Sequence, residues 1–159
     1  MKDLYSIFFK YYLILVFILF LWLIHFLNYY FVLNLHELGV FPRSLEGLIG
    51  VFFSPIIHSS SDHNHIINNS VPFLILGWAL FYFYSPIAWR VLFFSWIFTG
   101  LLVWFSARDA YHIGLSGVIY SLLFFLFFSG VFRKDTRLLT VALLVVFIYG
   151  SMVWGIFPY

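Results

Sequence analysis

Cysteine is absent from this chain, and charged residues are scarce. The absence of cysteine excludes disulfide bridges, thiol catalysis and cysteine-ligated metal sites. Charged residues make up 9% of the sequence, against about 25% in a typical soluble domain. The net charge of +2 is too small to indicate a nucleic-acid partner. With 64% hydrophobic and 25% aromatic residues, the composition predicts an integral membrane protein.

The apolar residues form continuous runs, rich in Leu and Phe, rather than short alternating segments. Such runs predict helices and not a β-barrel, whose strands alternate apolar and polar residues. One helical crossing of a bilayer core of about 30 Å needs about 20 apolar residues. About five segments meet or approach this length, which predicts one all-α helical bundle in a single membrane domain over residues 1–159. We place the helices at 8–33, 64–84, 87–105, 114–131 and 137–156.

The longest connection, residues 34–63, is too apolar for a solvated loop, yet its apolar pieces are too short for a membrane helix. Arg43 and Glu46 interrupt these pieces. We therefore expect short helices or turns around Pro42 and Pro55, half-embedded in one leaflet, and no complete span.

Lysine and arginine are distributed unevenly between the two ends of the predicted helices. Six of the eight lie at the end that carries the N-terminus, and two lie at the other end. Because cytoplasmic loops are enriched in these residues, we expect the N-terminus inside and the first long loop outside. The starts of the second and fourth helices then share the outer face. The six are Lys2, Lys10, Arg90, Arg133, Lys134 and Arg137, and the two are Arg43 and Arg108.

Two polar side chains, His65 and Asn69, lie four residues apart at the start of the second predicted helix. Residues at this spacing share one face of a helix, so the imidazole and the carboxamide can point at one small volume. Both groups are costly in lipid and are expected to face protein or water. They form either part of a site or hydrogen bonds between helices, and the spacing alone leaves both interpretations open.

A serine between two glycines opens the fourth predicted helix, in the sequence Gly114-Leu115-Ser116-Gly117. The first backbone N–H groups of a helix have no partner within it, and the helix dipole is positive there. An oxyanion formed by attack of Ser116 on a carbonyl would be stabilised at this position. Because Gly and Ser also let membrane helices approach closely, a packing face is the alternative.

A polar segment rich in histidine and serine precedes the second predicted helix. His58, Asp62, His63 and His65 are possible zinc ligands, but their spacing matches no strong metal signature and no thiolate is present. We therefore expect no metal and no other cofactor. The segment is better interpreted as an aqueous loop in which Asp62 caps the following helix.

The two polar motifs together resemble those of the rhomboid family of intramembrane serine proteases. The second predicted helix opens with Asp-His-Asn-His-Ile-Ile-Asn-Asn, and the fourth opens with Gly-Leu-Ser-Gly-Val-Ile-Tyr. The resemblance covers essentially the whole chain. It implies a rhomboid-like bundle and an endopeptidase that cleaves transmembrane segments of protein substrates within the lipid bilayer.

The resemblance also implies a role for each motif residue. Ser116 corresponds to the nucleophile, and His65 and Asn69 correspond to residues that line the oxyanion hole together with Ser116. Tyr120 corresponds to a tyrosine that packs on the catalytic histidine. We expect Ser116, His65 and Asn69 to converge in one polar cavity open to the outer face. The motif glycines are Gly114 and Gly117.

One departure from the rhomboid pattern bears directly on the chemistry. Rhomboids carry the general-base histidine on a sixth core helix, in a context such as Gly-His-x-x-Gly, and these 159 residues contain no such motif. His112 lies four residues before Ser116, but in the predicted loop, where it is poorly placed to accept the serine proton. Serine without a base is a weak nucleophile. We therefore expect the 159-residue chain alone to lack appreciable activity. A catalytically inactive rhomboid-like protein that binds transmembrane helices is the alternative.

Overall fold

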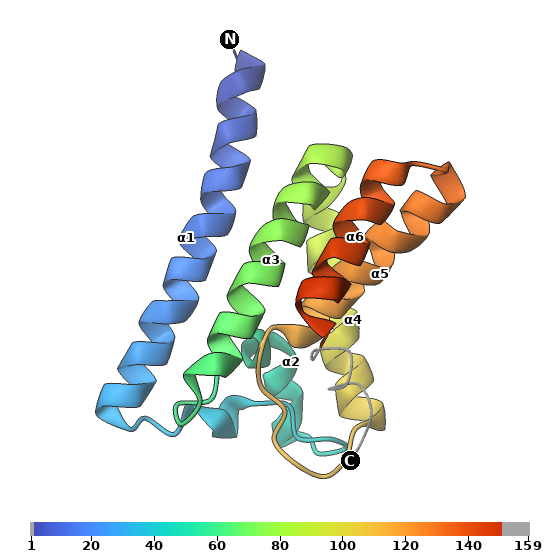
Figure 1. Cartoon of the computed structure of the whole chain (residues 1–159). Coiled ribbons are helices and arrows are strands. Elements are labelled where there is room, and N and C mark those ends of the chain that lie inside the picture. The colour runs from blue at the N-terminus through green and yellow to red at the C-terminus, as the bar shows by residue number, and fades with distance from the viewer. Residues whose placement is uncertain (1, 151–159) are drawn as a thin grey trace.

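The computed structural model describes residues 2–150, with side chains from residue 9 onward, and shows an all-α architecture (Figure 1). Four described helices are long and apolar enough to cross a membrane, which agrees with the predicted membrane fold. The predicted fifth segment begins as a fifth apolar helix, and its last residues, 151–156, lie outside the described part of the chain. The helices are α1 (Lys2–Phe31), α3 (His63–Tyr84), α4 (Ala88–Ser106), α5 (Ser116–Arg133) and α6 (Thr136–Ile148).

Helix α3 is the centre of the bundle. It packs against α1 on one side and against α5 and α6 on the other, while α4 packs mainly on α5. Leu76 and Leu80 of α3 and Leu122 and Leu126 of α5 are fully buried where these helices meet. Pro72 lies inside α3 and is itself buried, so the helix continues through it. Because lipid is as apolar as leucine, close packing rather than exclusion of water holds such helices together.

Aspartates begin two of the helices. The Asp62 carboxylate accepts a hydrogen bond from the backbone N–H of Asn64 at 2.9 Å, which confirms its predicted role as the cap of α3. Asp135 caps α6 in the same way, accepting from the N–H of Arg137 at 3.0 Å. Hydrogen bonds from the Arg137 side chain lower the pKa of the Asp135 carboxyl, so the cap is charged at neutral pH.

The connection between α1 and α3 contains only short helices and turns, as predicted. Its apolar helical part packs against α4. Two α4 indoles fix it there: Trp96 donates to the carbonyl of Phe52 at 3.1 Å, and Trp104 donates to that of Ser44 at 2.7 Å. The indole bonds satisfy carbonyl groups of irregular backbone at the edge of the bundle. The short elements are η1 (Leu35–Leu38), η2 (Glu46–Ile49), α2 (Gly50–Phe53) and η3 (Ser54–Ile56).

Backbone segments approach very closely inside this connection. A Cβ added to Gly50 would lie 2.2 Å from the carbonyl carbon of Gly39 and from the nitrogen of Val40. Neither backbone atom can move without disturbing the whole loop. The start of α2 therefore requires a residue with no side chain.

We predict that Gly50→Ala lowers the free energy of unfolding by about 2–3 kcal/mol, because the methyl group overpacks rigid backbone. Gly77→Ala is the matched control, since its new methyl group would meet only the flexible end of the Ile14 side chain at 3.2 Å. We expect the control to stay within about 1 kcal/mol of the parent. Denaturant titration in detergent micelles measures both variants, and equal losses would contradict the prediction.

Candidate active site

Ser116 is the first residue of α5 and lies at one end of the bundle, which we call the serine end. Its backbone N–H belongs to the first turn, whose N–H groups have no partner within the helix. The side chain is half-buried and lines a cavity of about 680 Å³ between the first loop, α4 and α5. Polar groups from four segments, the first loop, α4, the α4–α5 loop and α5, share this cavity with Ser116: Ser54, Thr99, Ser106, His112, Tyr120 and Ser121.

The turn before Ser116 depends on Gly114. Gly114 has φ +108°, which side chains rarely tolerate, and its N–H donates to the carbonyl of Ser54 at 2.8 Å. A Cβ at Gly114 would lie 2.5 Å from Nε2 of His65. Because Gly114 has no side chain, the His65 imidazole can lie against the backbone there. Gly114 is two residues before Ser116.

His65 and Asn69 share one face of α3, as their spacing predicts. The Asn69 carboxamide is buried and donates to the backbone carbonyl of His65 at 2.7 Å. Its oxygen has no partner among the described residues. Nδ1 of His65 accepts a long 3.5 Å contact from the N–H of Ser59, so in the neutral ring Nε2 carries the proton. That N–H lies against Gly114.

The structure brings the two motifs into contact but does not place them all around one cavity. Gly114, Ser116, Gly117 and Tyr120 line the cavity, whereas His65 and Asn69 do not. The reason is the position of α3: the cavity lies between α4 and α5, and no α3 residue lines it. His65 approaches the serine turn from the other side, over Gly114.

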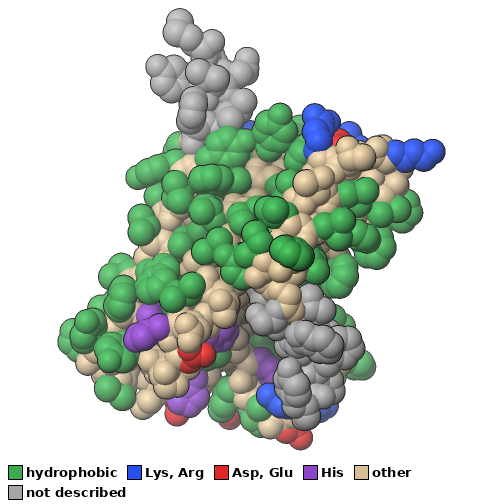
Figure 2. Space-filling model, viewed as in Figure 1, with side chains coloured by type: hydrophobic (Ala, Val, Ile, Leu, Met, Phe, Trp, Pro, Cys, Tyr) green, Lys and Arg blue, Asp and Glu red, His purple; other side chains and the backbone are tan. Residues whose placement is uncertain are grey.

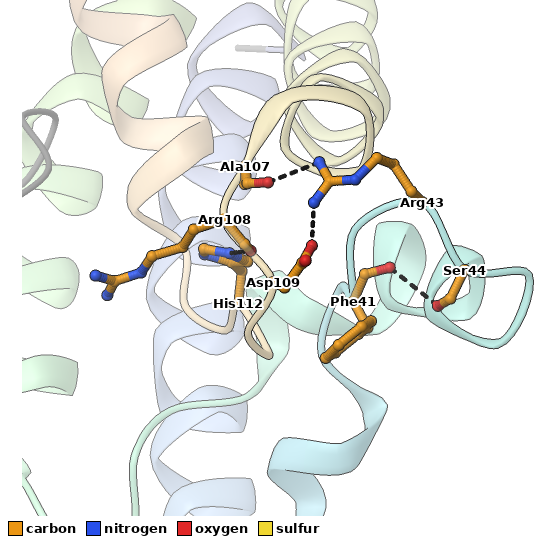
Figure 3. A network of polar contacts seen from close by, with 7 residues as sticks. All are labelled: Phe41, Arg43, Ser44, Ala107, Arg108, Asp109 and His112. Atoms are coloured by element: carbon orange, nitrogen blue, oxygen red, sulfur yellow. Dashed lines mark hydrogen bonds and ion pairs between the residues drawn. The ribbon is translucent and has the colours of Figure 1, made fainter.

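Hydrogen bonds and an ion pair join the loop before Ser116 to the first loop (Figure 3). Val40 and His112 exchange backbone hydrogen bonds of 2.9 and 2.8 Å. Arg43 donates to the carbonyl of Ala107 at 2.8 Å and forms an ion pair with Asp109. The sequence does not reveal these contacts, because the partners of Arg43 lie more than 60 residues away. Its role as an anchor appears only in the tertiary structure.

His112 lines the same cavity as Ser116, and its side chain contacts the backbone of its own loop. Its Nε2 lies 3.0 Å from the carbonyl oxygen of Arg108, within hydrogen-bond distance (Figure 3). No hydrogen bond joins a described histidine to Ser116. The expectation that His112 is poorly placed to act as a base stays a prediction.

His58 is a buried neighbour of the site that the sequence did not reveal. It is 1% exposed, and neither ring nitrogen has a hydrogen-bond partner among the described residues. Its ring meets that of His65 edge to face, with centroids 5.1 Å apart. Burial, and secondly the neighbouring His65, lower the pKa of His58 to about 3. The His58 ring is therefore neutral at pH 7, and it packs edge to face against the His65 ring without adding a charge.

The remaining histidines near α3 form a separate pair. Nε2 of His25 lies 2.7 Å from Nδ1 of His63 and joins α1 to α3. Within residues 9–150, whose side chains the structure describes, no three His, Asp or Glu side chains are grouped so that they could hold a metal ion.

Comparison with known proteins identifies the family. The sequence model of the Rhomboid domain matches residues 45–159, most of the chain. This protein belongs to the rhomboid family. Uncharacterised proteins of Mycobacterium tuberculosis and Mycobacterium bovis are each 31% identical to it over 152 residues, which cover 91% of this chain and 62% of the relative. An uncharacterised Mycobacterium leprae protein is 30% identical over 135 residues, 79% of this chain and 51% of that protein.

The chain thus spans less than two thirds of the length of these relatives. No solved structure gives a significant match. Family membership confirms the resemblance read from the two motifs and makes the four long apolar helices those of a multi-pass rhomboid membrane protein. Rhomboids are intramembrane serine proteases.

We predict that Gly114→Ala destabilises the protein by about 2 kcal/mol or more, because φ is positive and the new methyl group meets His65. Gly117→Ala should cost less, since its Cβ would contact only the Thr99 side chain, at 3.2 Å. Thermal unfolding in detergent and the imidazole NMR signals of His65 report the two effects. An unshifted His65 signal in Gly114→Ala would contradict the contact.

We predict that acid weakens the fold through His58. Its pKa is about 6.5 in the unfolded chain and about 3 in the folded protein, so the unfolded chain takes up the proton first as the pH falls. The contribution of neutral His58 to the free energy of unfolding is fully present above pH 6.5 and decreases toward pH 3. By pH 4 the free energy of unfolding has fallen by roughly 3 kcal/mol. His58→Phe should remove this part of the pH dependence in unfolding titrations between pH 7 and pH 4. Identical slopes in both proteins would refute the assignment.

Proposed function

We propose that this rhomboid protein is an intramembrane serine endopeptidase in which Ser116 attacks a peptide carbonyl of a transmembrane substrate. The observation that carries the proposal is the position of Ser116. It begins α5, half-buried at a cavity that several polar side chains line, and His65 lies over the preceding turn. A serine at the positive end of a helix dipole can form an oxyanion next to unpaired backbone N–H groups.

Three donors are available to the oxyanion. The backbone N–H of Ser116 lies in the unpaired first turn, and Nε2–H of His65 points at the same turn. The Asn69 carboxamide has two N–H groups, and its bond to the carbonyl of His65 uses one of them. Because His65 and Asn69 do not line the cavity in this structure, the substrate carbonyl has to enter on the α3 side of Ser116. His58 keeps the His65 ring in place for that contact.

Tyr120 lies one helical turn after Ser116 and lines the same cavity. In the proposed enzyme, the face of α5 that carries these two residues receives the histidine that accepts the serine proton. Among the described residues no histidine forms a hydrogen bond with Ser116, and His112, which lines the same cavity, instead contacts the carbonyl of Arg108. We therefore propose that residues 1–159 alone hold the nucleophile and the oxyanion donors without the base.

The same observation supports a second candidate function. A rhomboid protein without a base could bind a transmembrane helix at the Ser116 cavity and leave it uncut. Binding would use the same loops and helices, so the two functions differ only in whether Ser116 reacts.

The test is cleavage of a helical transmembrane substrate in reconstituted vesicles, by the protein expressed from its natural gene and by residues 1–159 alone. We expect the natural protein to cleave and Ser116→Ala to lower the rate by about 10⁴-fold or more, as for other serine nucleophiles. Residues 1–159 alone should not cleave. Ser121→Ala is the matched control, because Ser121 lines the same cavity and donates to Ser95 at 2.9 Å.

Capture of the substrate helix by both proteins, with no cleavage by either, would replace the protease with the binding function. Ser116-dependent cleavage by residues 1–159 alone would show that a histidine of this segment acts as the base. In that case the assignment of His112 and His65 to other roles would be wrong.

A further inference from the structure

The end of the bundle opposite Ser116 is here called the basic end. A second cavity lies there. It has a volume of about 790 Å³ and lies between α1 and α6, with α3 as its floor. Nearly all of its surface is apolar, and we call it the α1–α6 slot. Its lining residues come from three helices, α1 (Tyr11, Tyr12, Leu15), α3 (Ile75, Trp78, Ala79, Tyr82, Phe83) and α6 (Val141).

The basic end carries an excess of positive charge (Figure 2). Among residues 9–150 it holds five Lys and Arg side chains and a single carboxylate, Asp135, whereas the serine end holds two Arg and four carboxylates. Because the five basic groups come from α1, from α4, and from the end of α5 to the start of α6, folding brings together charges that are far apart in sequence. They are Lys10, Arg90, Arg133, Lys134 and Arg137.

Two of these cations, Lys10 and Arg137, neighbour residues that line the α1–α6 slot. The guanidinium carbon of Arg137 lies 5.6 Å from the centre of the Phe83 ring, which lines the slot. On the α1 side of the slot, Lys10 directly precedes the lining residue Tyr11. The Lys10 ammonium group donates a hydrogen bond to the hydroxyl of Ser85, just after the end of α3. The Arg137 side chain is 70% exposed, so it can bind a ligand in addition to Asp135.

We propose that the α1–α6 slot binds one anionic phospholipid, with an acyl chain along the slot and its phosphate between Lys10 and Arg137. A hydrocarbon occupant fits an apolar slot between membrane-spanning helices, and the neighbouring cations select a negative headgroup. An apolar transmembrane helix would also fit the slot, but it carries no negative group to pair with Lys10 and Arg137. The site is independent of the proposed chemistry at Ser116, because the two lie at opposite ends of the bundle.

Trp78 provides a direct reporter of the slot. It is 38% exposed, lines the slot, and its indole N–H donates to the carbonyl of Tyr11 at 3.3 Å. Bromine atoms on an acyl chain quench the fluorescence of a tryptophan that they touch. The signal of Trp78 is obtained by subtracting the fluorescence of Trp78→Phe from that of the parent protein.

The experiment uses the full chain in phosphatidylcholine vesicles that contain a small fraction of brominated phosphatidylglycerol or, separately, the same fraction of brominated phosphatidylcholine. We expect the anionic lipid to quench Trp78 at lower mole fractions, and unlabelled phosphatidylglycerol to relieve the quenching. Equal quenching by the two lipids would show that ordinary surrounding lipid covers the slot, and would overturn the proposal.

Variants separate the headgroup contacts from the slot. Lys10→Gln and Arg137→Gln should each weaken the apparent affinity for the anionic lipid about five-fold, and Arg137→Lys should keep most of it. Arg108→Gln, which removes a cation at the serine end, should have no effect. Val141→Phe should reduce quenching by filling the slot while leaving every charge in place. Quenching that is unchanged in Lys10→Gln, Arg137→Gln and Val141→Phe would also overturn the proposal. Competition by unlabelled phosphatidylglycerol, which should relieve the quenching, tests the proposal in the unaltered protein.

Discussion

The pairing of the first loop with the turn before α5 is the constraint on which the site depends. Val40 and His112 exchange backbone hydrogen bonds, and the N–H of Gly114 donates to Ser54. Both pairs join irregular backbone at the edge of a membrane bundle, where an unsatisfied N–H or carbonyl group is costly. Because each segment satisfies the polar groups of the other, neither can keep its shape alone. The position of Ser116 therefore depends on a loop that is more than 50 residues away in sequence.

Glycine makes that pairing possible. At Gly50 the first loop touches its own backbone, and at Gly114 the serine turn makes room for the His65 imidazole. A side chain at either position would separate segments that have to meet. The residues proposed as oxyanion donors and as nucleophile lie on two helices, α3 and α5, and His65 of α3 meets the turn before α5 at Gly114. His58 then supports His65 from behind, and it does so as a neutral ring because burial lowers its pKa to about 3.

The two ends of the molecule are chemically different. The serine end gathers all six histidines and most of the carboxylates, whereas the basic end gathers most of the lysines and arginines. An intramembrane protease has to admit a peptide and water at one face while the rest of the bundle remains in lipid. The proposed lipid site assigns a different task to the other end, which is to anchor the bundle in a leaflet of negative charge.

The sequence by itself determined the long apolar helices and the family, and it selected the residues that we propose for the site. Long apolar runs leave a chain in lipid little choice but helices, and the spacing of His65 and Asn69 places them on one face of α3. Only the tertiary structure decided what those residues meet. That His58 is buried, that Arg43 anchors the serine loop, and that His65 approaches Ser116 over Gly114 and not through the cavity all depend on contacts between distant segments. Local patterns carry no information about such contacts, because they arise from how the helices pack.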